Sequence, residues 1–332
     1  MKTAVIGSGA WGTALAIRLC KNGHSVVLWS HDARKTGQMC RTRCNPRLPN
    51  AALPEAISLS SENACVSGCK LVVMACPSFS MRAVCRGIAP YLDDDAVMAC
   101  ATKGIEDLSL LRMSQVISQE TGKTVVVLTG PSHAEEVSQD IPTGCLAACA
   151  NKDAAELVQD AFMAETFRVY TSPDTIGAEI GGALKNVVAL CAGVTDGLGY
   201  GDNTKAMLMT RGLTEIARLG VSLGASKDTF AGLAGIGDLI VTCTSLHSRN
   251  RRAGILIGQG KSPVDAMQEV GAVVEGYFAA KSAWAVCGKQ GVDMPILHAA
   301  YAVLYEGESA ASVVKTLLRR SKKAESEDAG WI

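Results

Sequence analysis

A lysine stands in the middle of a predicted helix, residues 174–195, that is apolar almost all round. The side chains three and four positions from Lys185, which share its helix face, are those of Gly181, Gly182, Val188 and Ala189. None of them can neutralise an ammonium group. Because a buried charge is costly unless it is paired or useful, Lys185 either reaches solvent or a distant carboxylate, or it takes part in chemistry.

A glycine-rich turn near the start of the chain has the spacing that binds a dinucleotide. The stretch AVIGSGAWG places Gly7, Gly9 and Gly12 as G-x-G-x-x-G between a predicted strand and a predicted helix. The first glycine permits a tight turn, the second lets the backbone approach a pyrophosphate, and the third allows close helix–strand packing. The position between strand and helix makes this motif a strong indication of NAD or NADP.

The end of the second predicted strand leaves the choice between the two cofactors open. Asp32 lies about 20 residues after Gly12, the usual distance for an acid that binds the ribose of NAD. His31 beside it, with Arg34 close by, can instead accept the 2′-phosphate of NADP.

Two further stretches follow predicted strands, at the carboxyl ends where ligands of α/β proteins bind. Lys103 ends the stretch ACATK, and Gly130 and Ser132 follow the next strand in LTGPSHAEEV. A solvated lysine and a simple N-terminal helix cap at Ser132 remain the alternatives at these two places.

Charged residues also gather between 233 and 275. Asp238 follows a flexible Gly-x-Gly and can orient a catalytic lysine. Arg249, with Arg251 and Arg252, can bind phosphate bidentately or form a solvated basic patch. Glu275 is expected at a helix start, where its charge suits the helix dipole.

The elements that must position these residues form two groups. Short, continuous apolar runs alternate with amphipathic helices up to about residue 170, at 3–7, 25–29, 71–76, 96–102, 124–130 and 145–149. That alternation predicts an α/β fold with an N-terminal Rossmann-type doubly wound parallel sheet. Long helical patterns dominate from about 173, at 174–195, 203–223, 249–259, 263–270, 275–290, 295–306 and 309–320. We therefore expect a dinucleotide-binding domain over 1–172 and an all-α substrate domain over 173–332.

Composition limits the partners of the 332-residue chain. It is 48% hydrophobic and 19% charged with a net charge of zero, which gives no electrostatic case for nucleic acid or a membrane surface. The 13 cysteines have mostly apolar flanks, so we expect small buried side chains in a reducing cytoplasm and no metal site. No run of 18 apolar residues lacks glycine or charge, so no membrane span is expected. The polar stretch 321–330 is expected to fray.

Taken together, eight motifs resemble one family. In order and in register the sequence contains GSGAWGTALA, ATKGI, GPSHAEE, GGALKNVVA, GLGYGDN, GIGDLIVTC, SRNRR and VVEGY. They are similar to the bacterial-type NAD(P)-dependent glycerol-3-phosphate dehydrogenases, over about residues 3–320. The resemblance implies a C-terminal domain like that of 6-phosphogluconate dehydrogenase, and hydride transfer between NAD(P)H and C2 of dihydroxyacetone phosphate for phospholipid synthesis.

The resemblance also implies roles for individual residues. Lys185 is the implied proton donor and acceptor at the substrate oxygen. The implied substrate contacts are Lys103, Gly130, Ser132, Lys185, Asp238, Ser248, Arg249 and Asn250. The implied cofactor contacts are Gly7, Gly9, Ala10, Trp11, Gly12, His31, Lys103, Ala134, Arg249, Val273 and Glu275. Many relatives carry Ser at the position of Ala10, a loss that matters little because the backbone N–H contacts the phosphate.

A lysine with a pKa near the ordinary value of about 10.4 is protonated at neutral pH. Reduction would then be favoured near neutrality and oxidation at alkaline pH. The alternatives are another two-domain dehydrogenase, acting on a 3-hydroxy acid or a sugar acid, and a cofactor-sensing protein without catalysis. The helical second domain also suggests a homodimer.

Overall fold

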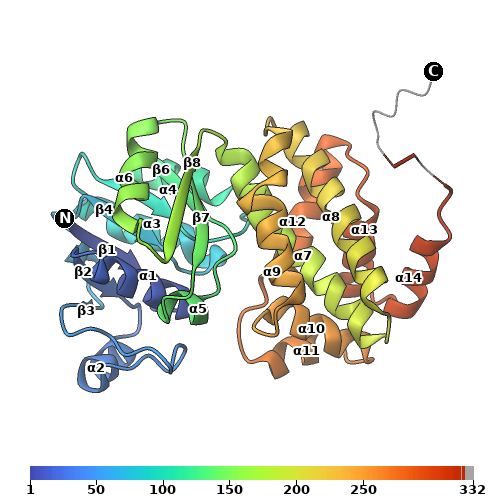
Figure 1. The fold of residues 1–332 in the computed structure, drawn as a ribbon, viewed down its shortest axis with the longest axis horizontal. Coiled ribbons are helices and arrows are strands. Elements are labelled where there is room, and N and C mark those ends of the chain that lie inside the picture. The colour runs from blue at the N-terminus through green and yellow to red at the C-terminus, as the bar shows by residue number, and fades with distance from the viewer. Residues whose placement is uncertain (323, 326–332) are drawn as a thin grey trace.

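An eight-stranded sheet and a helical bundle lie side by side in the computed structural model, which describes residues 1–322, 324 and 325 (Figure 1). The strands are β1 (Lys2–Ile6), β2 (Ser25–Trp29), β3 (Ser58–Ser60), β4 (Leu71–Met74), β5 (Val97–Cys100), β6 (Val125–Thr129), β7 (Thr143–Ala148) and β8 (Phe167–Ser172). Their order in the sheet is β3-β2-β1-β4-β5-β6-β7-β8. The stretch 321–330, expected to fray, lies largely outside the described residues.

The predicted α/β class and Rossmann-type sheet are confirmed, with one correction to its parallel pairing. Every neighbouring pair of strands is parallel except β6 and β7, which are antiparallel. Strands β3 and β8 were not predicted. β3 has only three residues, and β8 alternates buried and exposed side chains over most of its length at the edge of the sheet, so neither forms a continuous apolar run.

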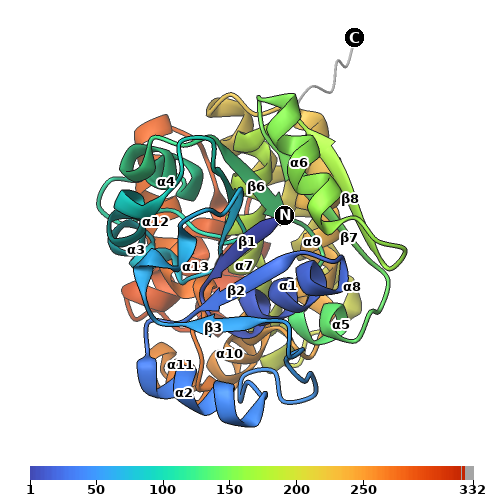
Figure 2. The ribbon, with the colours of Figure 1, turned by 90° about the vertical axis from the view of Figure 1, so that its left-hand side faces the viewer.

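Helices cover both faces of the sheet, which explains the continuous apolar strands. The helices of this part are α1 (Ala10–Lys21), α2 (Ala33–Thr42), α3 (Met81–Ile88), α4 (Met113–Thr121), α5 (Ala134–Ser138) and α6 (Lys152–Phe162). Alternate residues of β1 show the division, because Val5 packs in the core with α1 and α6 whereas Ile6 packs in the core with α3 and α4. Figure 2 shows these two sets of helices on opposite sides of the sheet.

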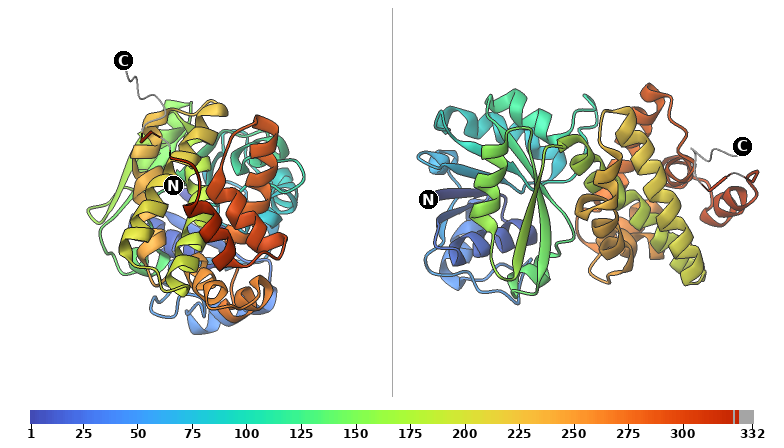
Figure 3. Two further views of the ribbon diagram at one scale, coloured as in Figure 1. Left: turned by 90° about the vertical axis from the view of Figure 1, so that its right-hand side faces the viewer. Right: turned by 45° about the horizontal axis from the view of Figure 1, so that its top comes forward.

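The remaining helices form a bundle, and most of them contact its longest member, α7. They are α7 (Thr175–Gly197), α8 (Asp202–Ser222), α9 (Asp238–Thr244), α10 (Arg249–Gly258), α11 (Pro263–Val270), α12 (Glu275–Gln290), α13 (Pro295–Tyr305) and α14 (Ala310–Leu318). Helix α7 contacts α8, α9, α10 and α12. Figure 3 shows the helical bundle and the sheet in two further views. Within the described residues, α7 is the one helix long and apolar enough to cross a membrane, but 89% of that apolar window is buried inside the fold.

Helices α7 and α10 touch through their backbones. A Cβ on Gly193 of α7 would overlap the carbonyl oxygen of Arg251, and a Cβ on Gly254 of α10 would overlap that of Leu190. Gly197 and Gly258, each four residues further along, repeat the contact one turn on. The start of α10 is thereby held at a fixed place beside the middle of α7.

Candidate active site

The glycine turn between β1 and α1 has the geometry that the motif predicts. Gly7 has φ +123°, and a Cβ there would lie 2.5 Å from the carbonyl oxygen of Ala75. A Cβ on Gly12 would overlap the carbonyl oxygen of Gly7. Gly9, the residue before α1, is not crowded in this way. A Cβ added there would have no atom of the described residues within 4 Å, apart from the neighbouring backbone. Gly9 therefore leaves open space beside the N-terminus of α1, which fits the approach of a pyrophosphate.

Cationic groups flank this turn at the end of β2. The Asp32 carboxylate caps α2, because Oδ1 accepts hydrogen bonds from the backbone N–H groups of Arg34 (2.9 Å) and Lys35 (3.1 Å). These bonds lower the pKa of Asp32. The Lys35 ammonium donates to the carbonyl oxygen of Ser8 within the glycine turn, at 2.8 Å. His31, the predicted cofactor contact, is exposed at the same edge.

Lys185 has a carboxylate partner from another helix. Its Nζ donates to Oδ1 of Asp238, the first residue of α9, and to the Thr242 hydroxyl at 2.6 Å. Lys103, from the loop after β5, donates to the other Asp238 oxygen at 2.6 Å and to the Gly130 carbonyl oxygen at 3.3 Å. Lys185 and Asp238 are buried, with 6% and 1% of their surfaces exposed. Two ammonium groups therefore share one buried carboxylate beyond the carboxyl ends of β5 and β6.

Burial changes the acidity of Lys185. Desolvation lowers its pKa from the ordinary value, the positive charge of Lys103 lowers it further, and Asp238 opposes both effects. The expectation of an ordinary lysine pKa was therefore wrong, because the sequence does not show that the amine is fully enclosed. A lysine of this kind can exchange its proton at a lower pH than a solvated lysine.

The segment after β6 contributes backbone groups rather than a helix cap. Gly130 has φ +143°, and the Ser132 hydroxyl donates to its carbonyl oxygen at 3.0 Å. His133, not Ser132, precedes α5, so the alternative of a capping role for Ser132 is wrong. Ala134 is the buried first residue of α5.

The start of α10 is hydrogen-bonded to α7 at Asn186, the residue after Lys185. Ser248 caps this helix by accepting from the Arg251 backbone N–H at 3.2 Å. Asn250 donates to the Asn186 side chain at 2.9 Å and accepts from the Gly276 backbone N–H at 2.8 Å. Asn250 of α10 thus connects the Asn186 side chain of α7 to the backbone of α12, and Asn186 is the neighbour of Lys185 in the sequence.

The three arginines of this segment do not form one cluster. Arg251 forms an ion pair with Asp196 at 2.8 Å, whereas Arg249 is exposed. The charge of Arg249 reaches Glu275, whose pKa is nevertheless raised by burial and whose carboxylate accepts from the Ser78 hydroxyl at 3.1 Å. Glu275 begins α12 as expected, and Val273 lies two residues before it.

The structure brings together Lys103, Gly130, Lys185 and Asp238 through direct hydrogen bonds, with Ser132 attached through Gly130. Gly7, Gly9, Ala10, Trp11 and Gly12 lie together at the start of α1, with His31 after the neighbouring strand. Thr242 and Asn186 were not assigned from sequence. Thr242 lies one helical turn after Asp238, and that spacing would have indicated it. Among the described residues no group of three or more His, Cys, Asp or Glu side chains is placed to hold a metal ion.

Comparisons with known proteins agree with this geometry. The family models for the NAD-dependent glycerol-3-phosphate dehydrogenase N-terminus and C-terminus match residues 2–155 and 174–315. Glycerol-3-phosphate dehydrogenase [NAD(P)+] of a Thermoanaerobacter species is 49% identical over 326 residues, covering 98% of this chain and 99% of that protein. The enzyme of the same name from Pelotomaculum thermopropionicum is 52% identical over 334 residues, covering 98% and 95%.

A solved structure extends the similarity to three dimensions. Glycerol-3-phosphate dehydrogenase from Coxiella burnetii superposes with a TM-score of 0.93 at 35% identity, covering 96% of this chain and 99% of that chain. The sequence matches and this structural match span both the sheet and the helical bundle. The chain therefore belongs to the NAD(P)-dependent glycerol-3-phosphate dehydrogenase family.

Proposed function

We propose that the protein is an NAD(P)-dependent oxidoreductase that interconverts dihydroxyacetone phosphate and sn-glycerol 3-phosphate, the precursor for phospholipid synthesis. The observation that carries the proposal is the hydrogen-bonded set of buried Lys185, buried Asp238 and half-buried Lys103 beyond the same sheet edge as the glycine turn. A proton donor and a nucleotide cradle at one edge are what ketone reduction with a dinucleotide requires. The identity of the substrate, glycerol 3-phosphate, is inferred from membership of the family.

Lys185 is the proposed acid and base at the substrate C2 oxygen. The bound nicotinamide supplies or accepts the hydride. In reduction, negative charge develops on that oxygen, and Lys185 as an ammonium donates the proton while Lys103 stabilises the charge. In oxidation, neutral Lys185 accepts the hydroxyl proton. Asp238 holds both lysines by accepting a hydrogen bond from each.

The other proposed substrate contacts lie around this pair. Arg249 is exposed at the start of α10 and supplies a guanidinium that can bind the phosphate bidentately. The remaining proposed substrate contacts are Gly130, Ser132, Ser248 and Asn250.

The proposed cofactor contacts extend from the glycine turn to α12. Gly9 and the N-terminus of α1 would hold the pyrophosphate, because a Cβ at Gly9 meets nothing there among the described residues. The further proposed contacts are Gly7, Ala10, Trp11, Gly12, His31, Lys103, Ala134, Arg249, Val273 and Glu275.

We also propose a domain division at residues 172 and 173, a homodimer, and a cytoplasmic location. The end of β8 at Ser172 and the start of α7 at Thr175 support the division. The many cysteines, free throughout the described residues, support a reducing compartment.

A spectrophotometric assay tests the function. Dihydroxyacetone phosphate is mixed with the protein and either NADH or NADPH, and the loss of reduced-cofactor absorbance is followed. Parallel reactions contain dihydroxyacetone, a 3-oxo acid or the oxo form of a sugar acid, each with a carbonyl group that can accept the hydride. Turnover that requires the phosphate supports the proposal, whereas turnover of an acid instead would assign another dehydrogenase activity. No oxidation with any ketone would indicate a cofactor-binding protein without catalysis.

A further inference from the structure

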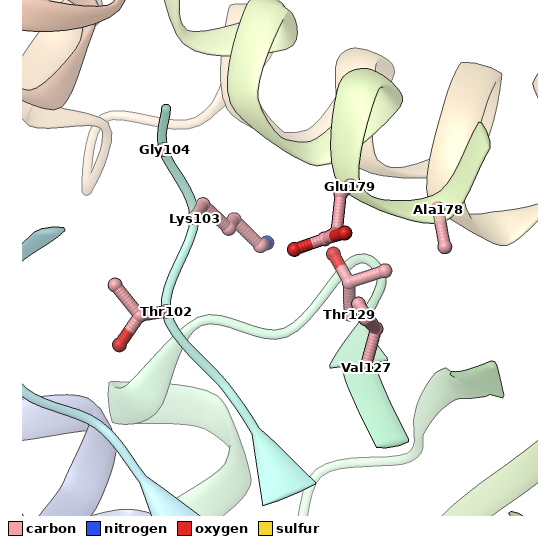
Figure 4. Close-up of a pocket in the computed structure, with 7 residues that line it drawn as sticks. All are labelled: Thr102, Lys103, Gly104, Val127, Thr129, Ala178 and Glu179. Carbon is pink, nitrogen blue, oxygen red and sulfur yellow. The ribbon is translucent and has the colours of Figure 1, made fainter. Parts of the chain in front are cut away.

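A small cavity lies between the sheet and α7, with Lys103 in its wall. Its volume is about 10 Å³, and its polar lining includes the side chains of Lys103, Thr129 and Glu179 (Figure 4). The Lys103 ammonium points toward the Glu179 carboxylate in this view, with the Thr129 hydroxyl beside it. A space of roughly 10–15 Å³ holds one water molecule when two to four polar groups surround it.

Thr129 is the last residue of β6, immediately before Gly130, and 3% of its surface is exposed. Within the part of the chain that the structure describes, its buried hydroxyl has no hydrogen-bond partner. Leaving a buried hydroxyl unsatisfied is costly, and groups of this kind are normally paired with protein or with an ordered water.

Glu179 joins the catalytic helix to the nucleotide-binding part of the chain. It lies on α7 with 6% of its surface exposed, and it accepts from the Ser114 backbone N–H at 2.7 Å and the Ser114 hydroxyl at 2.6 Å. Its carboxylate also pairs with Arg112. Ser114 is in the first turn of α4, so Glu179 fixes α7 against that helix.

Hydrogen-bonding capacity remains on both charged groups. The Lys103 ammonium has three donors and uses two, toward Asp238 and Gly130. The Glu179 carboxylate has about four lone-pair sites and accepts three bonds, from Arg112 and twice from Ser114.

We propose that the cavity binds one ordered water that accepts from Lys103 and Thr129 and donates to Glu179. The water links Glu179, which fixes α7 against α4, to the ammonium of Lys103, which faces the proposed substrate. Thr129 and Glu179 are then positioning residues, because they act on the reaction through Lys103 and do not touch the substrate. The kinetic part of this proposal rests on the proposed function.

The crystallographic test compares the wild-type protein with Thr129→Val, which keeps the side-chain shape but removes the hydroxyl. We expect electron density for a water within hydrogen-bond distance of Lys103, Thr129 and Glu179 in the wild type, and no water in Thr129→Val. An empty wild-type cavity, or a water that persists unchanged in Thr129→Val, would overturn the proposal. The wild-type result decides the water site whatever the enzyme's substrate is.

The kinetic test uses Thr129→Ser as the matched control. Thr129→Val should lower kcat about three- to tenfold, the effect of one hydrogen bond, with the KM for dihydroxyacetone phosphate changed by less than about twofold. Thr129→Ser retains the hydroxyl and should restore kcat to near the wild-type value. A kcat for Thr129→Val within about twofold of wild type, or an equal loss in Thr129→Ser, would contradict the positioning role. If the wild type itself does not turn over this substrate, the proposed function fails and the water site stands on the density alone.

Discussion

The glycine turn and the lysine–aspartate set lie at the same edge of the sheet but are built on opposite principles. The turn presents backbone groups to open space at Gly9 and is made from residues adjacent in sequence. The set encloses charged side chains, and its hydrogen bonds join residues 53 and 135 positions apart.

The contrast suggests a division within the proposed site, in which the glycine turn binds the cofactor and the lysine–aspartate set transfers the proton. A turn that depends on the absence of side chains tolerates little change in shape but carries no titratable group. The buried set depends on charge balance, since one carboxylate serves two ammonium groups. Substitutions in the lysine–aspartate set should therefore leave cofactor binding by the glycine turn largely intact.

Replacing Lys185 with alanine gives the largest expected effect. Turnover of dihydroxyacetone phosphate should fall by about 10²–10⁴-fold, because general acid–base catalysis is lost, while NADH binding followed by fluorescence stays near normal. Lys152→Ala, at an exposed lysine of α6, is the control. Near-normal turnover in Lys185→Ala would show that the role is wrong.

Asp238→Asn tests whether the shared carboxylate is needed by both lysines. It removes the counter-charge of the buried Lys185 and the half-buried Lys103, so the free energy of unfolding should fall by about 3 kcal/mol and kcat by about 100-fold. Urea denaturation and steady-state kinetics measure the two effects. Asp94→Asn removes a fully exposed carboxylate and should change neither. Wild-type stability in Asp238→Asn would mean that the lysines do not depend on this charge.

Two alanine substitutions in the glycine turn separate folding from binding. Gly12→Ala should destabilise the protein by about 1–3 kcal/mol, because the new Cβ overlaps the Gly7 carbonyl oxygen. Gly9→Ala should alter stability by less than about 0.5 kcal/mol but weaken NADH binding by about tenfold, because its Cβ occupies the space next to the start of α1. Equal destabilisation by both substitutions would contradict the assigned roles of the two glycines.

The pH dependence is the smallest and most specific effect. In the proposed mechanism, oxidation of glycerol 3-phosphate needs neutral Lys185, and burial lowers the pKa of this lysine. The kcat for oxidation should therefore rise with pH and reach half its maximum below the ordinary lysine value of about 10.4. The kcat for reduction should fall over the same range. A half-maximum at or above the ordinary value would show that the lysine titrates as a solvated group.

Most of the fold could be predicted from the sequence because the patterns that indicate helices and strands lie within short segments. Helix α7 and the helices from α10 to α14 follow the predicted ranges closely, since each has an apolar pattern with capping residues or glycine at its ends. Helix α2 was not predicted. It buries only Thr36 and Met39, so it lacks an apolar stripe that sequence periodicity can detect.

The candidate site was predicted only in part for a related reason. The glycine turn could be derived from spacing alone, because all its residues are neighbours. The sequence predicted that Asp238 could orient a catalytic lysine, and the hydrogen bond to Lys185 agrees with this, but no sequence pattern showed that one Asp238 carboxylate binds both Lys103 and Lys185. The buried ion pair and the lowered pKa of Lys185 became visible only with the packing of α7.

The contact between α7 and α10 sets a limit on how the substrate range of this protein can be redesigned. The two helices are in backbone contact where Gly193 and Gly254 meet. No substitution there can therefore shorten the distance between Lys185 and the start of α10. A Cβ added at either glycine would force the helices apart along their length. For the proposed substrate site, variants that accept a longer substrate should therefore come from insertions in the segment 245–247, ahead of the Ser248 cap of α10, rather than from changes inside the helix pair.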